Sequence, residues 1–191
     1  MSVIPKVDAS AQQQSDSYLV EQCLQGNKDC FRQLYQRYQQ RVRYSLYRLC
    51  GASLLDDLVQ EVFLRAWKGL PHLRQATQFS TWLYRITWNV ASDRRRQLGQ
   101  QRCQEAKLIG DRTKLFPAPD LMHLHYQDLV QRGLQQIKLE HRAVLVLHDL
   151  EELPQKEVAQ ILGIPVGTVK SRLFHARAAM RQFLEAQGVQ L

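Results

Sequence analysis

The sequence predicts an all-α protein of two small helical bundles, residues 16–98 and 120–187, joined by a flexible linker over residues 99–119. Apolar residues recur at spacings of three and four through both bundles, and alternation with a period of two is never sustained. Between the bundles this period disappears, and Gln, Arg, Lys, Gly and two prolines predominate. The polar, Gln-rich start, residues 1–15, is predicted to be a disordered tail.

Three helices are predicted in the first bundle. The first covers residues 31–49 and ends at the glycine that follows, because glycine commonly closes a helix. The second opens at Ser53 with Asp56 three residues on, the arrangement of a capping box, and Pro71 ends it. The third opens at Ser80, a good N-cap residue, and runs into a basic segment.

The second bundle begins with a helix over residues 121–137, for which Asp120 is the expected N-cap. A short and very apolar helix is expected over residues 144–150. A Gly-Ile-Pro turn at 163–165 then separates two further helices. The second bundle is therefore expected to end in a helix-turn-helix.

Spacing within this last motif supports the expectation. Ala159, Gly163 and Val169 lie at relative positions 0, +4 and +10. The first must be small where two helices cross, the second needs positive φ in the turn, and the third is a branched apolar residue on the buried side. The second helix, from about residue 166 to 180, would then lie in the major groove of duplex DNA.

The side chains predicted to contact duplex DNA from this helix are Thr168, Lys170, Ser171, Arg172, Phe174, His175 and Arg177. Its N-terminal half would read base edges, and its arginines would contact phosphates. The alternative interpretation is that these basic residues only solvate one face of a bundle helix.

The third helix of the first bundle carries a second candidate surface, in which cations and an amide lie beside an aromatic ring. Such a combination can stack on unpaired bases and follow their phosphates, so it suits single-stranded or melting DNA. Its residues are Arg85, Trp88, Asn89, Ser92, Arg94, Arg95 and Arg96. The alternative is that the tryptophan belongs to the core and the arginines form a solvated helix end.

The second helix carries a stripe of different chemistry, acidic and apolar at once. It consists of Asp57, Gln60, Glu61 and Leu64, with Asp56 adjacent and with Phe63 and Trp67 nearby. Such a stripe repels nucleic acid and suits a protein partner. Ordinary amphipathic packing, with acids placed favourably at a helix N-terminus, explains it equally well.

Composition agrees with a nucleic-acid partner. Lysine and arginine total 26 against 18 acidic residues, a formal net charge of +8 that favours nucleic acid or an acidic membrane surface. The basic excess lies in residues 16–98 and 155–191, on either side of an acidic block. No apolar run is long enough to span a bilayer, so a cytoplasmic protein without membrane insertion is expected.

No pattern indicates catalysis, a metal site or a bound cofactor, so no enzymatic activity is expected. Glycine-rich phosphate loops, HExxH and G-x-S-x-G are all absent from the sequence. The cysteines, Cys23, Cys30, Cys50 and Cys103, form no CxxC pair and are predicted to be reduced thiols. A redox-sensing pair of Cys23 and Cys30 is the alternative.

Three blocks of the chain resemble the signature blocks of one family. They are DDLVQEVFLRAW at residues 56–67, FSTWLYRITWN at 79–89 and PVGTVKSR at 165–172. In this order, with a linker before the third, they resemble the extracytoplasmic-function (group 4) sigma factors, the smallest members of the sigma-70 family. The resemblance implies a sigma-2 domain at residues 16–98 and a sigma-4 domain at 120–187. Together these would bind core RNA polymerase and direct promoter-specific transcription initiation.

The resemblance also implies a role for each candidate surface. The acidic stripe would dock on the clamp helices of the polymerase beta-prime subunit, and the beta flap would be a second polymerase contact. The basic stripe would open and hold the minus-10 element, with the loop at residues 74–79 framing a flipped base. The helix-turn-helix would read the minus-35 element as duplex, and the linker would thread toward the active-site channel. An anti-sigma factor is a candidate partner, since family members are usually held inactive by one.

Two departures from the family limit what is carried over. Pro154 stands where relatives often have a Ser or Thr cap, and Lys170 and His175 stand where many have arginine. No minus-35 sequence preference is therefore inferred. A stand-alone helix-turn-helix regulator that binds duplex DNA without polymerase is the alternative function, although it leaves the acidic stripe and Trp88 unexplained. A serine recombinase would need a βαβ domain, which the helical periodicity disfavours.

Overall fold

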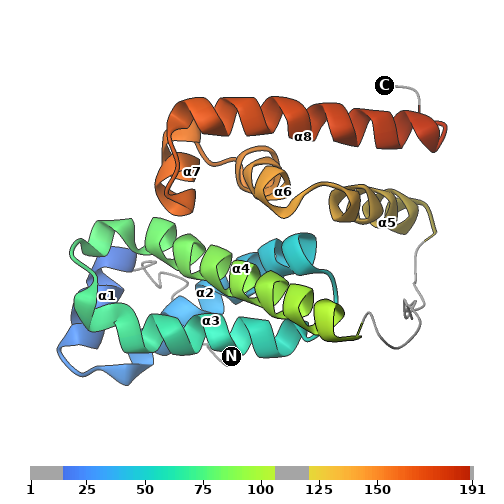
Figure 1. The fold of residues 1–191 in the computed structure, drawn as a ribbon. Helices are drawn as coiled ribbons and strands as arrows, with labels where there is room; N and C mark the ends of the chain where they lie inside the picture. The colour runs from blue at the N-terminus through green and yellow to red at the C-terminus, as the bar shows by residue number, and fades with distance from the viewer. Residues whose placement is uncertain (1–14, 106–120, 190–191) are drawn as a thin grey trace, which may run out of the picture.

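The computed structural model describes residues 15–105 and 121–189, and the all-α prediction is confirmed: no strand occurs among these residues (Figure 1). The first bundle consists of α1 (Asp16–Leu24), α2 (Lys28–Cys50), α3 (Leu55–Gly69), the 3-10 turns η1 (Leu70–His72) and η2 (Ala76–Gln78), and α4 (Phe79–Glu105). The second consists of α5 (Leu121–Gln136), α6 (Leu139–Leu145), the π-helical turn η3 (Val146–Leu150), α7 (Gln155–Leu162) and α8 (Val166–Ala186).

Helix α1 was not predicted from the sequence, because it is short and its apolar pattern is weak. Ser15 caps its first turn by accepting a hydrogen bond from a backbone N–H at 3.3 Å. The chain then reverses at Gly26, whose φ of +98° favours glycine. The carboxylate of Asp16 accepts hydrogen bonds from Arg37 and Tyr38, which ties α1 to α2.

The capping box expected at the start of α3 is not formed. Leu54 adopts a left-handed conformation with φ +57°, and α3 begins after it with no side-chain cap. Asp56 instead accepts a hydrogen bond from Arg43 Nη1 at 2.5 Å, so its carboxylate is used across the α2–α3 contact. The predicted stop of α2 is confirmed, because Gly51 has φ +82°.

Helix α4 differs from the prediction at both ends. It begins at Phe79, directly after η2, and it continues through residues 99–105, which were assigned to the linker. Gln and Arg are good helix formers, so their intrinsic helix propensity can extend a helix past the end of its apolar period. The rest of the predicted linker and the predicted tail, residues 1–14, lie outside the described ranges.

The second bundle contains two further corrections. The helix predicted over residues 144–150 begins earlier, at Leu139, and its last turn is the π-helical η3. Helix α8 runs to Ala186, beyond the expected end near residue 180. The expected cap Asp120 lies outside the described residues.

The two bundles share one continuous core in this structure. The largest fully buried side chains come from both, among them Leu34, Leu46, Phe79, Leu83, Leu134, Val144 and Ile161. Burying each such side chain stabilises the fold by about 1.5–3 kcal/mol. Figure 1 shows the resulting two layers, with α5–α8 lying over α1–α4 and α7 standing over α4. The linker prediction did not anticipate this contact.

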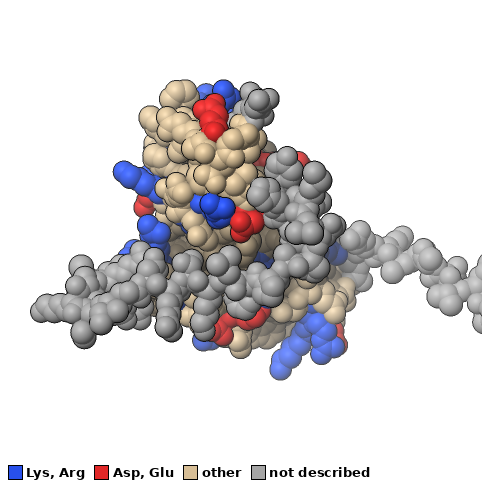
Figure 2. Space-filling view, turned by 90° about the vertical axis from the view of Figure 1, so that its right-hand side faces the viewer, with Lys and Arg blue, Asp and Glu red and all other residues tan. Residues whose placement is uncertain are grey.

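Charge does not gather into one field on the face shown in Figure 2, where basic and acidic side chains lie interspersed among uncharged ones. A duplex-binding protein held by bulk charge would present a single basic surface. On this face, any DNA contact would therefore depend on local groups of side chains.

Candidate protein and nucleic-acid interfaces

A groove between α2 and α3, with a volume of about 700 Å³, contains three of the five residues predicted to contact a protein partner. Asp56, Gln60 and Leu64 line it, and the Leu64 side chain lies at its surface with 45% exposure. Large apolar groups exposed beside a groove are typical of surfaces that a partner covers. We refer to this feature as the α2–α3 groove.

Four aromatic side chains line this groove: Phe63 and Trp67, which were expected near the acidic stripe, and Phe31 and Tyr35, which were not. The rings of Phe31 and Trp67 pack edge to face with centroids 4.9 Å apart, and those of Tyr35 and Phe63 do so at 4.6 Å. Phe31 and Tyr35 lie one turn apart on α2. Their spacing along α2 could not reveal that they line the groove, because their ring partners lie on α3.

The acidic groups of the stripe differ in their environments. Asp57 is exposed, whereas Glu61 accepts a hydrogen bond from Arg65 at 2.7 Å. Arg65 also donates to Asp93 at 2.8 Å, and hydrogen bonds to Asp93 and Glu61 raise its pKa. Exposed ion pairs of this kind stabilise a fold by about 0–1 kcal/mol. Glu61 can therefore exchange Arg65 for a partner at little cost.

The predicted single-strand surface lies along α4. Arg85, Asn89, Arg95 and Arg96 are exposed, whereas Trp88, Ser92 and Arg94 are half-buried. Trp88 packs partly against the core, so part of its surface serves folding. No carboxylate in the described part of the chain forms an ion pair with an arginine of this set. We call these residues the α4 stripe.

The expected base-framing loop is smaller than residues 74–79. Phe79, its last residue, has no exposed surface and packs against Tyr38 and Trp82, with ring centroids 5.5 and 5.9 Å away. A side chain buried this deeply cannot contact a base. The exposed residues before η2, such as Arg74, are the part of the loop that a base could reach.

The helix-turn-helix has the geometry that its spacing predicted. Ala159 is buried, Gly163 ends α7 in the left-handed conformation with φ +66°, and Val169 has no exposed surface. Pro154 precedes α7 and offers no side-chain cap, in agreement with its cyclic side chain. Helix α8 therefore presents the opposite face to solvent.

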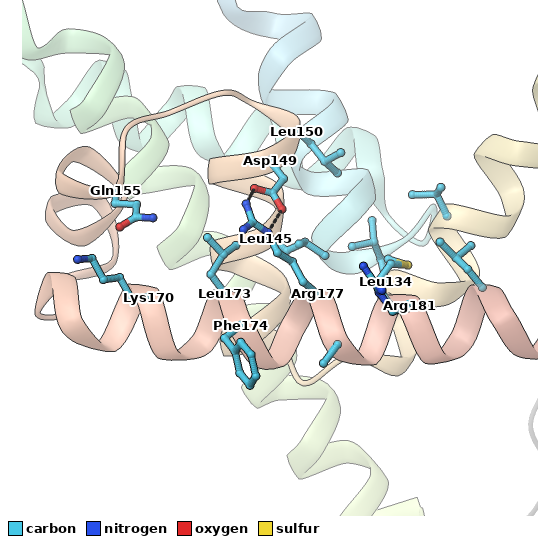
Figure 3. A pocket seen from close by; sticks show the side chains of 14 residues that line it. Leu134, Leu145, Asp149, Leu150, Gln155, Lys170, Leu173, Phe174, Arg177 and Arg181 are labelled. Atoms are coloured by element: carbon cyan, nitrogen blue, oxygen red, sulfur yellow. Dashed lines mark hydrogen bonds and ion pairs between the residues drawn. The ribbon is translucent and has the colours of Figure 1, made fainter. Parts of the chain in front are cut away.

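The exposed face of α8 carries most of the predicted duplex contacts. Lys170, Ser171 and His175 are exposed, Thr168 and Arg172 are half-buried, and Phe174 is 71% exposed. Figure 3 shows Phe174 projecting outward from α8. An aromatic side chain this exposed contributes nothing to the core and is free to contact a partner.

Two histidines stack where α8 crosses α6. The rings of His175 and His141 lie nearly parallel, 18° apart, with centroids separated by 5.8 Å. Burial lowers the pKa of His141, and the neighbouring His175, Arg172 and Lys138 lower it further, whereas Glu140 opposes the shift. These effects favour the neutral form of His141, which lies beside His175, one of the predicted duplex contacts.

Arg177, predicted to contact a phosphate, already has a partner. Its Nε and Nη2 donate to the two carboxylate oxygens of Asp149 at 2.8 and 2.7 Å (Figure 3). Asp149 belongs to η3 and lies 28 positions away in sequence, so no local pattern could reveal the pair. The pair borders an apolar groove of about 710 Å³ between α5, η3 and α8.

The contacts between the two bundles include a polar set that we call the seam: Glu151, Glu157, Gln131 and Arg142 with their partners on α2 and α4. The Glu151 side chain, 10% exposed, accepts hydrogen bonds from Ser45 and Tyr84 at 2.9 Å and from Arg48 at 3.4 Å. Burial and the adjacent Glu151 raise the pKa of Tyr84, so its hydroxyl stays protonated.

Three further hydrogen bonds cross the seam. Thr81 donates to Glu157 at 2.6 Å, linking α4 to the first helix of the helix-turn-helix. The Gln131 amide donates to the carbonyl oxygen of Tyr47 at 2.7 Å, and Arg142 donates to that of Leu49 at 2.5 Å. Sequence reasoning found none of these residues, because each pairs with a group in the other bundle.

Cys23, Cys30 and Cys50 are free thiols, and burial raises the pKa of Cys23 to about 11, which makes it a poor nucleophile. No group of three metal-ligating side chains occurs in residues 15–105 and 121–189. Within those same ranges, every helix is too short or too polar to cross a bilayer.

Comparison with known proteins gives matches to both bundles. A family model described as Sigma-70 region 2 matches residues 34–101, and one described as Sigma-70, region 4 matches residues 127–180. The ECF RNA polymerase sigma-E factor of Haemophilus influenzae is 32% identical over 177 residues, covering 87% of this chain and 94% of that protein. The ECF RNA polymerase sigma factor SigW of Bacillus subtilis is 30% identical over 176 residues, covering 86% and 94%.

Solved structures show the same architecture. CnrH, in a structure with the cytosolic domain of CnrY, aligns with a TM-score of 0.69 and 26% identity over 90% of this chain and 97% of that one. The sigma factor RpoE of Bartonella quintana, bound to the anti-sigma factor NepR, aligns with the same TM-score at 22% identity and shares the fold.

Proposed function

The chain belongs to the extracytoplasmic-function group of the sigma-70 family, and from this premise we propose how its surfaces divide the work of a sigma factor. It is an alternative sigma factor that binds core RNA polymerase and promoter DNA and directs promoter-specific transcription initiation. Sigma factors are non-enzymatic initiation factors, and we propose that this chain has no catalytic activity of its own and acts in the cytoplasm.

In the proposed division, residues 16–98, with the continuation of α4, dock on the polymerase and open the minus-10 element. Residues 120–187 bind the minus-35 duplex. The α2–α3 groove would receive the beta-prime clamp helices, with Asp56, Asp57, Gln60, Glu61 and Leu64 at the contact. The groove between α5, η3 and α8 is the proposed seat for the beta flap, because an apolar face there can bury a partner helix.

The α4 stripe is proposed to hold the opened strand at minus-10. Its arginines have no described carboxylate partner, and Trp88 and Asn89 adjoin them on one helix. On α8, Thr168, Lys170, Ser171 and Arg172 would read or position the minus-35 duplex, together with Phe174, His175 and Arg177. Of the proposed sites, the α2–α3 groove carries the assignment, because a duplex-binding regulator that acts alone has no use for it.

The seam must open during this function. The minus-35 and minus-10 elements are roughly 25 base pairs apart, and hence about 85 Å apart at about 3.4 Å per base pair. In this structure α4 packs against α7, the first helix of the helix-turn-helix, through Thr81 and Glu157. Two helices in contact cannot reach sites this far apart. We therefore infer that this arrangement is a closed state and that promoter binding separates the bundles.

RpoE of Bartonella quintana was solved in complex with the anti-sigma factor NepR, and CnrH in complex with the cytosolic domain of CnrY; we propose that an anti-sigma factor is a partner of this chain too. A closed sigma factor offers such a protein one continuous surface made from both bundles. Binding to that surface would favour the closed state by mass action.

Transcription with purified core polymerase tests the proposed function. We expect promoter-specific run-off transcripts when the full chain is added to core polymerase and a genomic promoter library. Specific operator binding by the free protein, without transcripts from any promoter, would refute it.

A pair of matched variants tests the docking site. Leu64→Glu places a charge in the α2–α3 groove and is expected to abolish binding to core polymerase. Leu24→Glu makes the same change at a similarly exposed leucine on α1, outside the groove, and should leave binding unchanged. Equal effects of the two substitutions would contradict the assignment.

A further inference from the structure

A second pocket, of about 320 Å³, lies between the two bundles and is lined by positive charge. Its walls come from α2, α4, α5 and α6, and its polar side chains are Arg94, Arg95, Gln135 and Arg142. Among the described residues, no carboxylate lines the pocket or forms an ion pair with any of these arginines. Three guanidinium groups therefore share one small space without a counter-charge among the described residues.

Arg142 is the most unusual of the three, because it is only 3% exposed. Its Nη atoms donate to the carbonyl oxygens of Leu49, Gln135 and Ile137 at 2.5, 2.8 and 3.0 Å, whereas its Nε has no partner. These carbonyls lie near the ends of α2 and α5, where the helix dipole offsets part of the charge. None of them is an anion, so most of a buried charge stays uncompensated.

The electrostatics of the pocket agree with this picture. Burial and the nearby Arg95 lower the pKa of Arg142 to about 10, a direction that reports an environment unfavourable to its charge. Burial raises the pKa of Cys50, which also lines the pocket. The positive charges of Arg94, Arg95 and Arg142 oppose this rise. An anion placed among the three guanidinium groups would remove this repulsion.

We propose that this pocket binds a small phosphorylated anion of the pyrophosphate or nucleotide class, held between the two bundles. Guanidinium groups match phosphate oxygens in a bidentate manner, and three of them suit more than one phosphate group. The volume lies at the lower end for small-molecule sites. A duplex backbone is too large for this role, because it cannot reach an Arg142 that is 3% exposed.

The site depends on the closed state, since Arg94 and Arg95 belong to the first bundle and Gln135 and Arg142 to the second. A ligand that binds only the closed state stabilises it by mass action. It would also withdraw Arg94 and Arg95 from the α4 stripe. The regulatory consequence, a phosphorylated metabolite that restrains promoter binding, rests on the proposed function, whereas binding itself does not.

Calorimetry on the full chain, without polymerase, tests the binding. Pyrophosphate, ADP and GDP are titrated at constant ionic strength, with sulfate and chloride as reference anions. We expect one ligand per chain for at least one phosphorylated anion, and a higher melting temperature with it. Pyrophosphate binding as tightly as the nucleotides would assign recognition to the phosphates alone, whereas tighter nucleotide binding would add a contact to the base; either result supports the site.

Matched variants of α4 place the ligand. Arg95→Gln should weaken binding at least about tenfold, the loss of one charged contact, whereas Arg96→Gln, next to it but outside the pocket, should not. Both positions are exposed, so neither change endangers the fold. Equal weakening by both variants, equal effects of sulfate and pyrophosphate, or no binding of any phosphorylated anion at millimolar concentration would each overturn the proposal. Because transcription is not measured, these outcomes leave the test of sigma activity independent.

Discussion

The seam and the proposed DNA-binding faces of α4 and α8 use similar residues under opposite conditions. At the seam, the carboxylate of Glu151 is nearly buried and accepts hydrogen bonds from three side chains of the other bundle. On α4, Arg85 and Asn89 are exposed and make no contact with a described carboxylate. Buried polar groups that are hydrogen-bonded hold the two bundles together. Exposed polar groups without an internal partner are available to bind another molecule.

Helix α8 is intermediate between these two conditions. Arg177 is exposed but paired with Asp149, and His175 is exposed but stacked on His141. The α8 side chains proposed to contact duplex DNA would already be held in place before binding. Arg85 and Asn89 on α4 would be ordered only when they bind the DNA strand. This difference suits the two targets, because a duplex has a fixed shape and an opened strand does not.

Removing the central carboxylate of the seam is expected to have the largest effect. Glu151→Ala leaves Ser45, Arg48 and Tyr84 without their acceptor and should destabilise the closed chain by about 3 kcal/mol. Urea unfolding of the full chain measures the loss. Glu152→Gln, at the exposed neighbouring residue, is the control. If both substitutions lower the free energy of unfolding by a similar amount, the hydrogen bonds of Glu151 do not stabilise the seam.

Substitution on the α4 stripe should impair strand opening, and at an exposed position such as Asn89 it should leave stability nearly unchanged. Asn89→Ala combined with Trp88→Ala is expected to cost about 1–3 kcal/mol in open-complex formation, since base stacking is lost. Permanganate reactivity of the opened strand, compared with closed-complex binding, measures it. Because Trp88 is half-buried, Asn89→Ala alone separates the DNA effect from folding. Equal losses in closed and open complexes would remove the distinction between α4 and α8.

A smaller change should release a paired group on α8. Asp149→Asn frees Arg177 and should strengthen non-specific duplex binding, with a salt dependence steeper by about one phosphate contact. Its cost in stability should be about 0–1 kcal/mol, because the Arg177 side chain is 56% exposed. Asp128→Asn, at an exposed acid on α5, is the matched control. Unchanged binding would mean that Arg177 never contacts DNA.

The smallest effect concerns pH. The pKa of His141 lies below its value of 6.5 in the unfolded chain, so between the two values the unfolded state binds more protons. The contribution of His141 is therefore full above about pH 6.5 and is lost as the pH falls toward the folded value. Unfolding curves between pH 5 and 8 should show a weaker acid dependence for His141→Gln. An unaltered profile would show that the stacked pair does not titrate.

Much of the fold follows from local pattern. The apolar spacing predicts α2, α3, α4 and the helix-turn-helix, because each buries one continuous face. The missed α1 is short, and the failed capping box at Ser53 depends on Leu54, whose left-handed backbone no local rule anticipates. The linker was overestimated because residues with high helix propensity, such as Gln and Arg, continued α4 after the apolar period that predicted it had ended.

The candidate site was predictable to the extent that its residues share a helix. The acidic stripe and the α4 stripe were found by spacing alone, and both lie at the surface as expected. Phe31 and Tyr35 escaped because they belong to the neighbouring helix, and Asp149 because it pairs over a long separation. The seam was beyond sequence reasoning, since a linker rich in polar residues does not reveal that the domains it joins are packed together.

The π-helical turn η3 sets the register on which the seam depends. It ends at Leu150, and Glu151 follows it directly. Because a π-helical turn closes on i→i+5 hydrogen bonds, η3 takes up one residue more than an α-helical turn and still directs Glu151 toward Tyr84. If the same residues wound as an α-helix, Glu151 would be rotated by about 100° around the helix axis, since an α-helix has about 3.6 residues per turn. The winding of this one turn thus decides whether the two domains can be coupled through Glu151.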